Sequence, residues 1–496
     1  MNSTYQSYYT KSEPILQYMT KMLNIKDNDS ILEPCGGDGV FVDKILSTNS
    51  NANICVLELN PNAVSTLRHK YSGNTNITIV ETDTLLNKSI VSSEKLYDKI
   101  IGNPPYGARN DEEKKDELNR LYHSLYTKES YTLFLYACIN CLKEGGELSF
   151  IIPDTFLSLH RHLMIRRFIL EHTQIKELSL FPSSFFPGVN FGYANLCIIT
   201  LRKSSDVCAN LSNLFCVRTG FSHVNEITSQ SAGTTRVYSQ SDIYSNVDSA
   251  FFFNSNERIN ELINGIFTQK IGDIASCVTG FYSGNDKLYL RPLNAEVRNA
   301  KKYEPIQPSE ICQHELAKDE RNNGISSDDC YVPIVKGGNK KYYKPDEWYM
   351  NWSRKAITEY RQSKKCRFQN SDFYFKEGGI AIPMIRSSRL TAALINGRLF
   401  DQSIVGIYPH SETLTYYLLA FFNSDVCTRI ITAINPSTNN SANYIKKIPF
   451  IQPSNETVSE VNLIVEQIIK LSKQDKDTAT LENRLNDIFN EMYQLD

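Results

Sequence analysis

The stretch Leu96-Tyr97-Asp98-Lys99-Ile100-Ile101-Gly102-Asn103-Pro104-Pro105-Tyr106 decides how this chain is to be interpreted. A mostly apolar, strand-like run ends abruptly at Asn-Pro-Pro-Tyr, where two prolines exclude a helix and fix the backbone. The amide of Asn103 and the carbonyl of Pro104 are then placed to accept hydrogen bonds from an amine. The ring of Tyr106 can stack on the planar group that carries this amine. A Pro-Pro turn with a core tyrosine is the alternative for these four residues alone.

Length and composition bound the class of protein. With 496 residues, 41% of them hydrophobic, the chain is long enough for two or three domains with cores of their own. A net charge of only −2 provides no global field for nucleic acid, so any basic face must be local. The first residues, MNSTYQSYYTKSEP, lack the pattern of a signal peptide, and no apolar run approaches the ~18 residues of a membrane span. We therefore expect no membrane association.

The twelve cysteines are scattered, and several lie in apolar runs. One C-x-x-C pair, Cys138 and Cys141, lies inside a helical pattern, and no second pair stands at the spacing of metal ligands. We expect reduced, buried thiols, no metal site and a reducing cytoplasm.

Strand-like and helix-like segments alternate through the first 203 residues. This alternation predicts an α/β fold in which a mostly parallel sheet carries helices on both faces. We expect strands at residues 30–32, 53–57, 77–80, 96–101, 147–152, 175–180 and 194–201. We expect helices at residues 12–23, 40–46, 131–142 and 160–171, and one that follows Pro61.

Polar residues follow the expected strands in a regular register. Glu33, Glu58, Asp83 and Asn103 each lie at a strand's carboxyl end, one per βα unit. In open parallel sheets ligands bind beyond these ends, so the four side chains are expected to gather around one ligand.

A glycine cluster gives this ligand its character. Gly36, Gly37 and Gly39 allow a tight turn and close approach of the backbone to a ligand. Glu58, 19 residues after Gly39, can bind both hydroxyls of a ribose, and Asp83 can accept from an adenine amino group. The glycines do not form G-x-G-x-x-G, which argues against a dinucleotide, and acids near a helix N-terminus suit a cationic ligand better than a phosphate. The pattern predicts a nucleoside site.

These motifs resemble the adenine-specific DNA methyltransferases that use S-adenosylmethionine. Their order is similar to the gamma class, the Taq-type enzymes of restriction–modification systems. The resemblance is specific over about residues 8–203 and looser beyond. It implies a Rossmann-like class I methyltransferase domain at residues 1–203, a mixed α+β DNA target-recognition domain at 204–452 and a helical segment at 453–496.

The resemblance also assigns roles to residues. The cofactor S-adenosylmethionine, which leaves as S-adenosylhomocysteine, is expected to contact Thr10, Glu33, Pro34, Cys35, Gly36, Glu58, Leu59, Asp83, Thr84, Asn103, Pro105 and Phe134. The catalytic set that it implies is Asn103, Pro104, Pro105, Tyr106 and Phe186. Phe186 is the match for the aromatic residue that sandwiches a flipped adenine against Tyr106, and Phe185 and Phe191 compete for this role.

The second half of the chain contains a local basic excess. Residues 331–400 hold 14 Lys and Arg against 5 Asp and Glu. An ordinary solvated basic face is the alternative to DNA binding, but aromatic residues interleave with the charges, among them Tyr342, Trp348 and Trp352. The expected DNA-binding residues are Lys336, Lys340, Lys341, Arg354, Arg361, Lys364, Lys365 and Arg386. Two apolar stripes in residues 455–496 predict two helices that pack on the domain.

The expected function is transfer of a methyl group to the N6 amino group of an adenine flipped out of duplex DNA, as the modification enzyme of a restriction–modification system. The partner is double-stranded DNA, and the resemblance allows a separately encoded restriction endonuclease. A monomer suffices to flip one adenine per event. Two alternatives remain: a methyltransferase of the same motif that acts on RNA or on a protein glutamine, and a DNA-binding subunit with an inactive methyltransferase fold.

Overall fold

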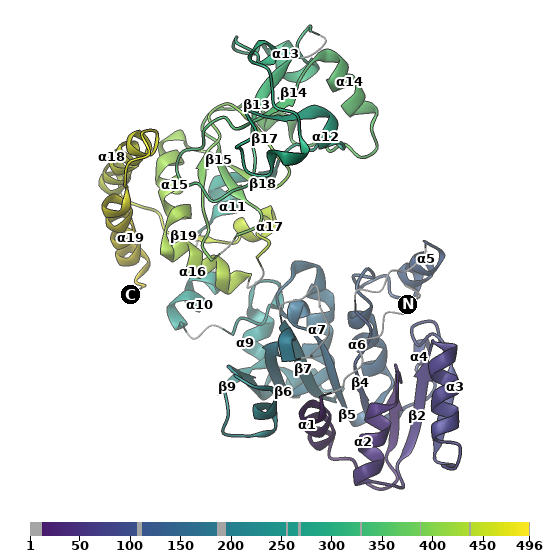
Figure 1. The fold of residues 1–496 in the computed structure, drawn as a ribbon. Helices are drawn as coiled ribbons and strands as arrows, with labels where there is room; N and C mark the ends of the chain where they lie inside the picture. The colour runs from purple at the N-terminus through teal and green to yellow at the C-terminus, as the bar shows by residue number, and fades with distance from the viewer. Residues whose placement is uncertain are drawn as a thin grey trace. The chain divides into compact units, whose positions relative to one another are not determined.

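The computed structural model describes residues 12–106, 112–185, 195–253, 256–265, 269–327, 330–386, 388–435 and 438–495. The chain forms two compact units, Met1–Phe252 and Phe253–Asp496 (Figure 1). Each unit has its own sheets and its own core.

The first unit is built on one nine-stranded sheet in the order β3-β2-β1-β4-β5-β7-β6-β8-β9. Neighbours from β3 to β5 are parallel, β7 is antiparallel to both β5 and β6, β6 and β8 are parallel, and β9 is antiparallel to β8. The fold class predicted from the alternating pattern is confirmed. The strands are β1 (Ser30–Glu33), β2 (Asn53–Glu58), β3 (Ile77–Glu81), β4 (Tyr97–Gly102), β5 (Leu142–Pro153), β6 (Thr173–Pro182), β7 (Asn195–Lys203), β8 (Leu214–Thr219) and β9 (Thr234–Ser239).

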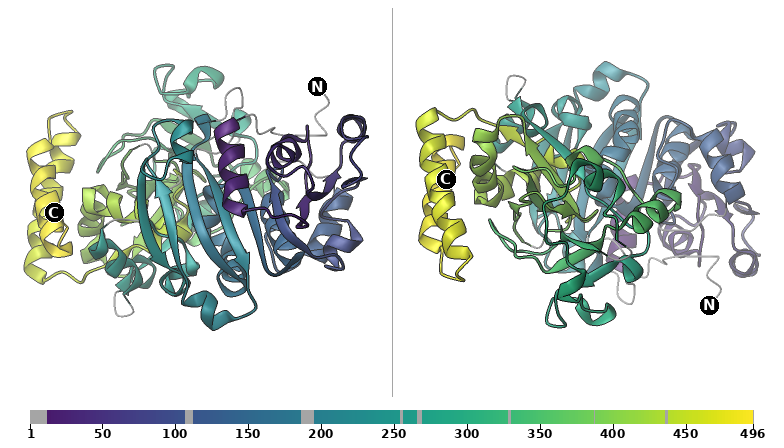
Figure 2. Two further views of the ribbon diagram at one scale, coloured as in Figure 1. Left: turned by 90° about the horizontal axis from the view of Figure 1, so that it is seen from below. Right: turned by 90° about the horizontal axis from the view of Figure 1, so that it is seen from above.

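Helices cover this sheet on both faces, as Figure 2 shows. The helices of the first unit are α1 (Glu13–Leu23), α2 (Val40–Thr48), α3 (Pro61–Lys70), α4 (Lys88–Val91), α5 (Glu112–Leu121), α6 (Ser130–Asn140), α7 (Leu163–His172), α8 (Val207–Leu211) and α9 (Gln240–Ser245). Local sequence sets their ends. Helix α3 begins where the Asn60 side chain accepts a hydrogen bond from the Asn62 N–H at 3.1 Å and where Pro61 fixes the first turn.

The first unit extends well beyond the domain boundary expected at residue 203. Strands β8 and β9 add to the sheet beyond β6, with pairs such as Leu178 with Val217. Buried Gln240, at the start of α9, donates to the carbonyls of Leu170 and Thr173. The unit therefore ends at Phe252 rather than at residue 203, because these strands complete the sheet.

The second unit holds two four-stranded sheets and a two-stranded pair. The first sheet has the order β11-β18-β15-β16, the second β12-β14-β13-β17, and β10 pairs with β19. Its strands are β10 (Gln269–Lys270), β11 (Ala275–Thr279), β12 (Leu290–Pro292), β13 (Tyr331–Val335), β14 (Trp348–Asn351), β15 (Ile380–Pro383), β16 (Ala393–Leu394), β17 (Leu399–Phe400), β18 (Ile404–Pro409) and β19 (Pro449–Phe450). Its helices are α10 (Glu257–Asn264), α11 (Ile271–Ile274), α12 (Asp286–Tyr289), α13 (Lys318–Asn323), α14 (Arg354–Gln362), α15 (Thr415–Asn423), α16 (Asp425–Ile434), α17 (Ala442–Ile445), α18 (Asn455–Ser472) and α19 (Ala479–Tyr493).

The last two helices, α18 and α19, pack on α15 and α16 within the second unit. Their buried residues include Val461, Val465 and Ile468 on α18 and Leu485 and Ile488 on α19, which are members of the two apolar stripes. The segment expected at residues 453–496 is thus a packing element of this unit.

No single helix in the described ranges is long and apolar enough to cross a membrane. Within the same described ranges, one pair of helical segments, Glu412–Asn423 and Asp425–Ile434, bent by 73°, has such a length and composition when taken together.

We predict that Phe489→Ala destabilises the second unit by about 3–5 kcal/mol, because a large buried ring leaves a cavity. Phe489 is fully buried, and its ring centroid lies 5.4 Å from that of Tyr417 and 5.5 Å from that of Phe421. The control is Leu463→Ala on α18, which removes a side chain that is 61% exposed and should change stability by no more than about 0.5 kcal/mol. Urea unfolding of both variants measures the difference, and equal losses would contradict this packing.

Candidate active site

The pairing of three adjacent strands places the predicted ligand-binding residues at one edge of the sheet. Strand β1 is hydrogen-bonded in parallel to β2 on one side and to β4 on the other. Glu33 ends β1, Glu58 ends β2 and Asn103 follows β4, so the three lie on strands ~4.8 Å apart. Asp83 follows β3, one strand farther out. The register expected from the sequence is confirmed.

The two glutamates at this edge are held in different ways. The carboxylate of Glu58 accepts from the Gly37 N–H at 2.7 Å through one oxygen and from the Asn60 N–H at 2.8 Å through the other. Glu33 is 1% exposed, and in the described part of the chain its Oε2 has no hydrogen-bond partner. Burial, with added repulsion from Glu58 and Asp43, raises the pKa of Glu33 well above its usual value. A cationic or hydrogen-bond-donating ligand would satisfy this acid.

The loop after β1 approaches its neighbours so closely that glycine is required. A Cβ on Gly36 would lie 2.3 Å from Val56 Cγ1, and Gly39 has a φ of 75°. Gly102 similarly lets the loop pack on the end of β4, where a Cβ would lie 3.3 Å from Pro34 Cδ. The segment that follows β3 holds this loop in place, because Thr84 Oγ1 donates to the Pro34 carbonyl at 2.6 Å. Thr84, expected to contact the cofactor, thus holds the loop that would contact it.

The other expected cofactor residues differ in their surroundings. Asp83 forms an ion pair with Lys114 of α5, and its Oδ1 accepts from the Leu85 N–H at 3.1 Å. Leu59, which follows Glu58, is 45% exposed and offers an apolar surface beside the acid. Phe134 is buried in α6. Asp83 would need to share its carboxylate with Lys114 in order to bind an adenine amino group.

The Asn-Pro-Pro-Tyr loop contacts both the glycine loop and α6. Burial raises the pKa of Cys35, and a hydrogen bond from the Asn103 backbone acts in the opposite direction, which places Asn103 against this thiol. Ser130 Oγ, at the start of α6, donates to the Pro105 carbonyl. Tyr106 is 1% exposed, so a base could stack on its ring only after the face of the ring is uncovered.

Three expected site residues, Thr10, Phe186 and Phe191, lie outside the described residues. Of the aromatic residues that compete to complete the base sandwich, Phe185 alone is described, and its ring stacks on that of Phe181 with centroids 5.8 Å apart.

Sequence reasoning missed one acidic residue at this edge. Asp154 directly follows β5, the neighbour of β4, and its pKa is raised to about 6 by burial, opposed by a hydrogen bond from Asn195. The adjacent Thr155 is within hydrogen-bonding distance of the Tyr131 hydroxyl, 2.7 Å away, next to Ser130, which binds the Pro105 carbonyl. The signal in the sequence was an acid directly after an apolar strand, as in Glu33 and Glu58.

Most of the expected DNA-binding cations are engaged within the second unit. Lys336 pairs with Asp401 at 3.0 Å and with Asp286 at 3.3 Å. The other engaged residues are Lys340 with Glu347, Lys341 with Glu482, Arg354 with Asp319, Arg361 with Asn322 and Asn323, and Arg386, which is 7% exposed and bound to Asn435 and Asn440. The interleaved aromatics Tyr342, Trp348 and Trp352 are buried in the core, so the aromatic part of the DNA-binding pattern is a packing pattern.

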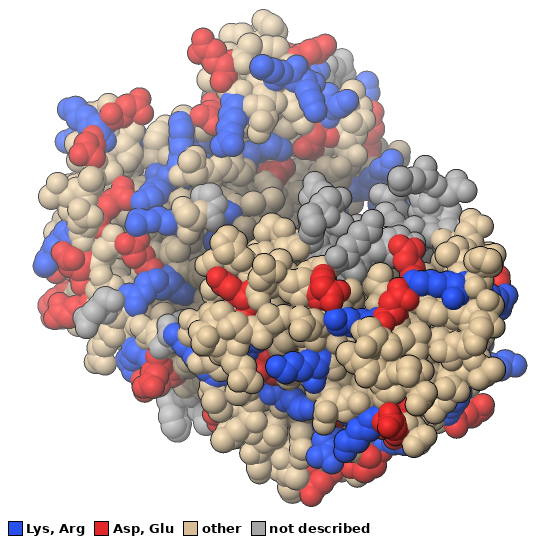
Figure 3. Space-filling model, turned by 60° about the horizontal axis from the view of Figure 1, so that its bottom comes forward, with Lys and Arg blue, Asp and Glu red and all other residues tan. Residues whose placement is uncertain are grey.

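Exposed cations remain on α14 and the segment after it. Lys355, Lys364, Lys365 and Arg367 are exposed, and the described part of the chain shows no ion pair for any of them. On the face of the molecule shown in Figure 3, basic and acidic side chains are interspersed rather than gathered into one patch. The exposed cations on α14 and after it are thus the candidates for a local basic face, as the small net charge indicates.

The sequence resemblance implies S-adenosylmethionine as the cofactor. The residues at the carboxyl ends of the strands fit this cofactor, because a buried acid without a hydrogen-bond partner among the described residues and a glycine cradle suit a cationic ligand that carries a ribose. Glu33, the Gly36 loop and Glu58 would hold it. Among the described residues no group of three His, Cys, Asp or Glu side chains is placed to bind a metal.

Residues 42–186 match the family model described as Eco57I restriction-modification methylase. The chain is 30% identical to the type II methyltransferase M.HincII of Haemophilus influenzae over 185 residues, which are 36% of this chain and 34% of that protein. It is 34% identical to the modification methylase CviBIII of Paramecium bursaria Chlorella virus NC1A over 176 residues, 35% of this chain and 43% of that protein. The chain thus spans less than half the length of these curated relatives. The expected resemblance to restriction–modification methyltransferases is confirmed over this segment.

Among solved structures, a DrdV–DNA complex matches 94% of this chain and 57% of that chain with a TM-score of 0.57 and 12% identity. Because only 12% of the residues are identical, this match shows a shared fold and no more; it covers both units.

We predict that Gly36→Ala destabilises the first unit by about 1–3 kcal/mol, because the new methyl group overlaps Val56 and the loop must shift. Gly73→Ala is the matched control, since nothing lies within 4 Å of a Cβ at that position. Chemical denaturation measures both changes. A Gly36→Ala variant as stable as Gly73→Ala would show that the glycine loop is not closely packed.

We also predict that Asp154 makes stability depend on pH. Its folded pKa of about 6 lies above the ordinary aspartate value of 3.8, so between these values the folded chain binds more protons than the unfolded chain. The stabilisation that is fully present below pH 3.8 is therefore lost as pH rises through 6. Asp154→Asn removes the titrating group, so from pH 4 to pH 7 the variant should gain about 1–3 kcal/mol relative to the wild-type protein. Denaturation at a series of pH values measures this, and a constant difference would contradict the raised pKa.

Proposed function

We propose that this protein is a sequence-specific DNA methyltransferase that transfers a methyl group from S-adenosylmethionine to the N6 amino group of a flipped adenine, as the modification enzyme of a restriction–modification system. The observation that carries the proposal is the placement of Glu33, Glu58 and the Asn103–Tyr106 loop at the ends of three adjacent strands. The likeness of residues 42–186 to restriction-modification methylases supports it.

The roles of the chain's residues follow from their chemistry. Glu58 is fixed through both oxygens by backbone N–H groups, which orients it to accept from ribose hydroxyls. Buried Glu33 favours a ligand with positive charge. When bound, S-adenosylmethionine supplies a methyl group that is already activated by its sulfonium, so positioning provides much of the remaining rate.

The Asn-Pro-Pro-Tyr loop would act on the target amine. An adenine inside a duplex cannot reach this edge, so it must leave the base stack, and aromatic rings such as Tyr106 would replace the lost stacking. The Asn103 amide oxygen and the Pro104 carbonyl would accept the two amine hydrogens and stabilise the positive charge that develops on nitrogen. The Pro105 carbonyl is already engaged by Ser130, which holds the loop in place.

The substrate would be double-stranded DNA contacted by the second unit. Its exposed cations Lys355, Lys364, Lys365 and Arg367 offer charges for phosphate contacts. The expected residues with internal partners, Lys336, Lys341 and Arg386 among them, would have to exchange these partners for DNA. The protein would act as a monomer. It would work in a reducing cytoplasm, where its twelve free cysteines stay reduced. A separately encoded endonuclease would be its functional partner.

We predict that wild-type protein transfers label from radioactive S-adenosylmethionine to adenine in duplex DNA at one short sequence, and that Asn103→Ala reduces the rate at least ~100-fold. The variant should still bind the cofactor, because Glu33 and Glu58 remain. Scintillation counting measures the rate, and sequencing that detects N6-methyladenine maps the product.

Two outcomes would contradict this proposal. Cofactor binding without any labelled DNA would favour an inactive DNA-binding subunit, and label in RNA or in protein glutamine but not in DNA would favour a different substrate of the same chemistry. Glu58→Ala provides the control for the cofactor site, since it should weaken cofactor binding and leave Asn103 in place.

A further inference from the structure

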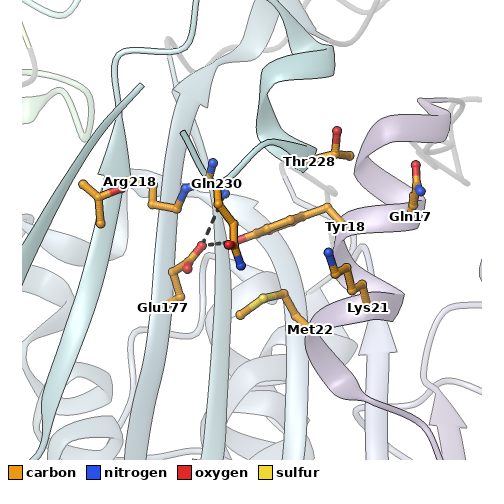
Figure 4. Close-up of a pocket in the computed structure, with 9 residues that line it drawn as sticks. Gln17, Tyr18, Lys21, Met22, Glu177, Arg218, Thr228 and Gln230 are labelled. Atoms are coloured by element: carbon orange, nitrogen blue, oxygen red, sulfur yellow. Dashed lines mark hydrogen bonds and ion pairs between the residues drawn. The ribbon is translucent and has the colours of Figure 1, made fainter. Parts of the chain in front are cut away.

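A cavity lies in the first unit, away from the strand ends that carry the cofactor residues. Its volume is about 260 Å³, and it lies between α1, strands β6, β8 and β9, and the short helix Val224–Thr228. The side chains that line it are Gln17, Tyr18, Lys21, Met22, Glu177, Arg218, Thr228, Gln230 and Thr235 (Figure 4).

The cavity is separate from the active site. Glu177 lies within β6 and Arg218 within β8, whereas Asn103 follows β4. The sheet order β4-β5-β7-β6 puts three strand spacings, about 14 Å, between β4 and β6. Lys21 and Met22, at the end of α1, lie just before the turn that leads into the amino end of β1, so this part of the lining is remote from the carboxyl ends of the strands.

A carboxylate stands at the centre of the lining. The hydroxyl of Tyr18 reaches from α1 and donates to Glu177 Oε1 (Figure 4). Ser179 Oγ donates to the same oxygen at 3.1 Å. Burial and the neighbouring Glu177 raise the pKa of Tyr18, so this hydroxyl remains a donor. Within the described residues these contacts all use Oε1, which leaves Oε2 to accept from a ligand.

A fixed cation stands beside this carboxylate. Arg218 Nη1 lies 3.7 Å from Glu177 Oε1 and donates to the Ile227 carbonyl at 2.9 Å, and Nη2 donates to the Ser229 carbonyl. The guanidinium also packs against the rings of Tyr18 and Phe221, 5.7 Å and 5.0 Å from their centroids. Its side chain is only 6% exposed, and its Nε has no partner in the described part of the chain. A buried charge held in this way cannot move away from the cavity.

The rim supplies a second cation. Lys21 is exposed, and within the described residues its ammonium makes no ion pair. Gln17, Thr228 and Gln230 add neutral hydrogen-bonding groups. The lining thus holds the ion pair of Glu177 with Arg218 and one further cation, Lys21. A ligand with a carboxylate for Lys21 and an ammonium for Glu177 Oε2 matches both groups, whereas a simple anion or a simple cation matches only one of them.

We propose that this cavity binds a small zwitterion of the amino-acid type, with its carboxylate toward Lys21 and Arg218 and its ammonium toward Glu177. The volume lies just below the roughly 300–1,000 Å³ of drug-sized sites, so it suits one amino acid rather than a nucleoside. A ligand held there would brace α1, which leads into β1 and the glycine loop, against the far strands of the sheet.

Isothermal titration of the full chain with each of the twenty proteinogenic L-amino acids tests this proposal. Sodium acetate and propylammonium chloride, titrated alone, present each charge without the other. At least one amino acid should bind, and both half-ligands should bind at least tenfold more weakly. Lys21→Ala and Glu177→Gln should each weaken the binding at least tenfold, because each removes one charge of the pair. Glu177→Gln retains an oxygen to accept from Tyr18, and Lys21→Ala changes an exposed side chain, so both variants should fold.

Two control variants separate this cavity from other sites. Lys26→Ala removes an exposed lysine from the same segment outside the cavity, and Glu58→Ala alters the cofactor site, so both should leave the binding of the amino acid unchanged. The proposal fails if no amino acid binds, if acetate binds as tightly, or if binding survives both cavity variants. It also fails if Glu58→Ala abolishes binding, since the amino acid would then occupy the cofactor site.

Discussion

The parallel pairing of β1 with both of its neighbours is the constraint on which the active site depends. Because β1 is hydrogen-bonded to β2 and β4, the residues that follow these three strands must emerge side by side. A shift of one residue in either pairing would turn the following side chains to the opposite face. The backbone hydrogen bonds of the sheet thus bring together the acids and the Asn-Pro-Pro-Tyr loop, which are far apart in sequence.

Close packing at this edge turns proximity into a defined geometry. Gly36 lies against Val56, and Gly102 lies against Pro34, so the glycine loop rests directly on strands β2 and β4. Thr84 ties the same loop to the segment after β3. The loop is therefore fixed by three neighbouring strands, and substitutions that act on cofactor binding would include residues that never touch the cofactor.

The features that depend on local sequence pattern and on strand register could be predicted from the sequence. The strands that carry Glu33, Glu58 and Asn103 were predictable because apolar runs end at polar residues at a regular interval, and α18 and α19 because their apolar stripes repeat with helical spacing. The partners of the cations were not predictable: Lys341 binds Glu482, 141 residues away, and Lys336 binds Asp286 and Asp401. Such pairs depend on tertiary folding, so a run of basic residues does not reveal how much charge remains on the surface. For the same reason strands β8 and β9 were assigned to the wrong unit.

The buried acid at the end of β1 links stability to ligand binding. Glu33 is held in a place where its charge is unfavourable, next to the charge of Glu58, and this penalty weakens the folded state. A ligand that brings positive charge to this edge would remove the penalty, so part of its binding free energy would be stabilisation of the fold. Replacing Glu33 with glutamine would therefore stabilise the folded state and at the same time weaken ligand binding. Buried acids normally have a hydrogen-bond donor, and among the described residues Glu33 Oε2 has none; this is the physical reason for the proposal that Glu33 contacts the ligand.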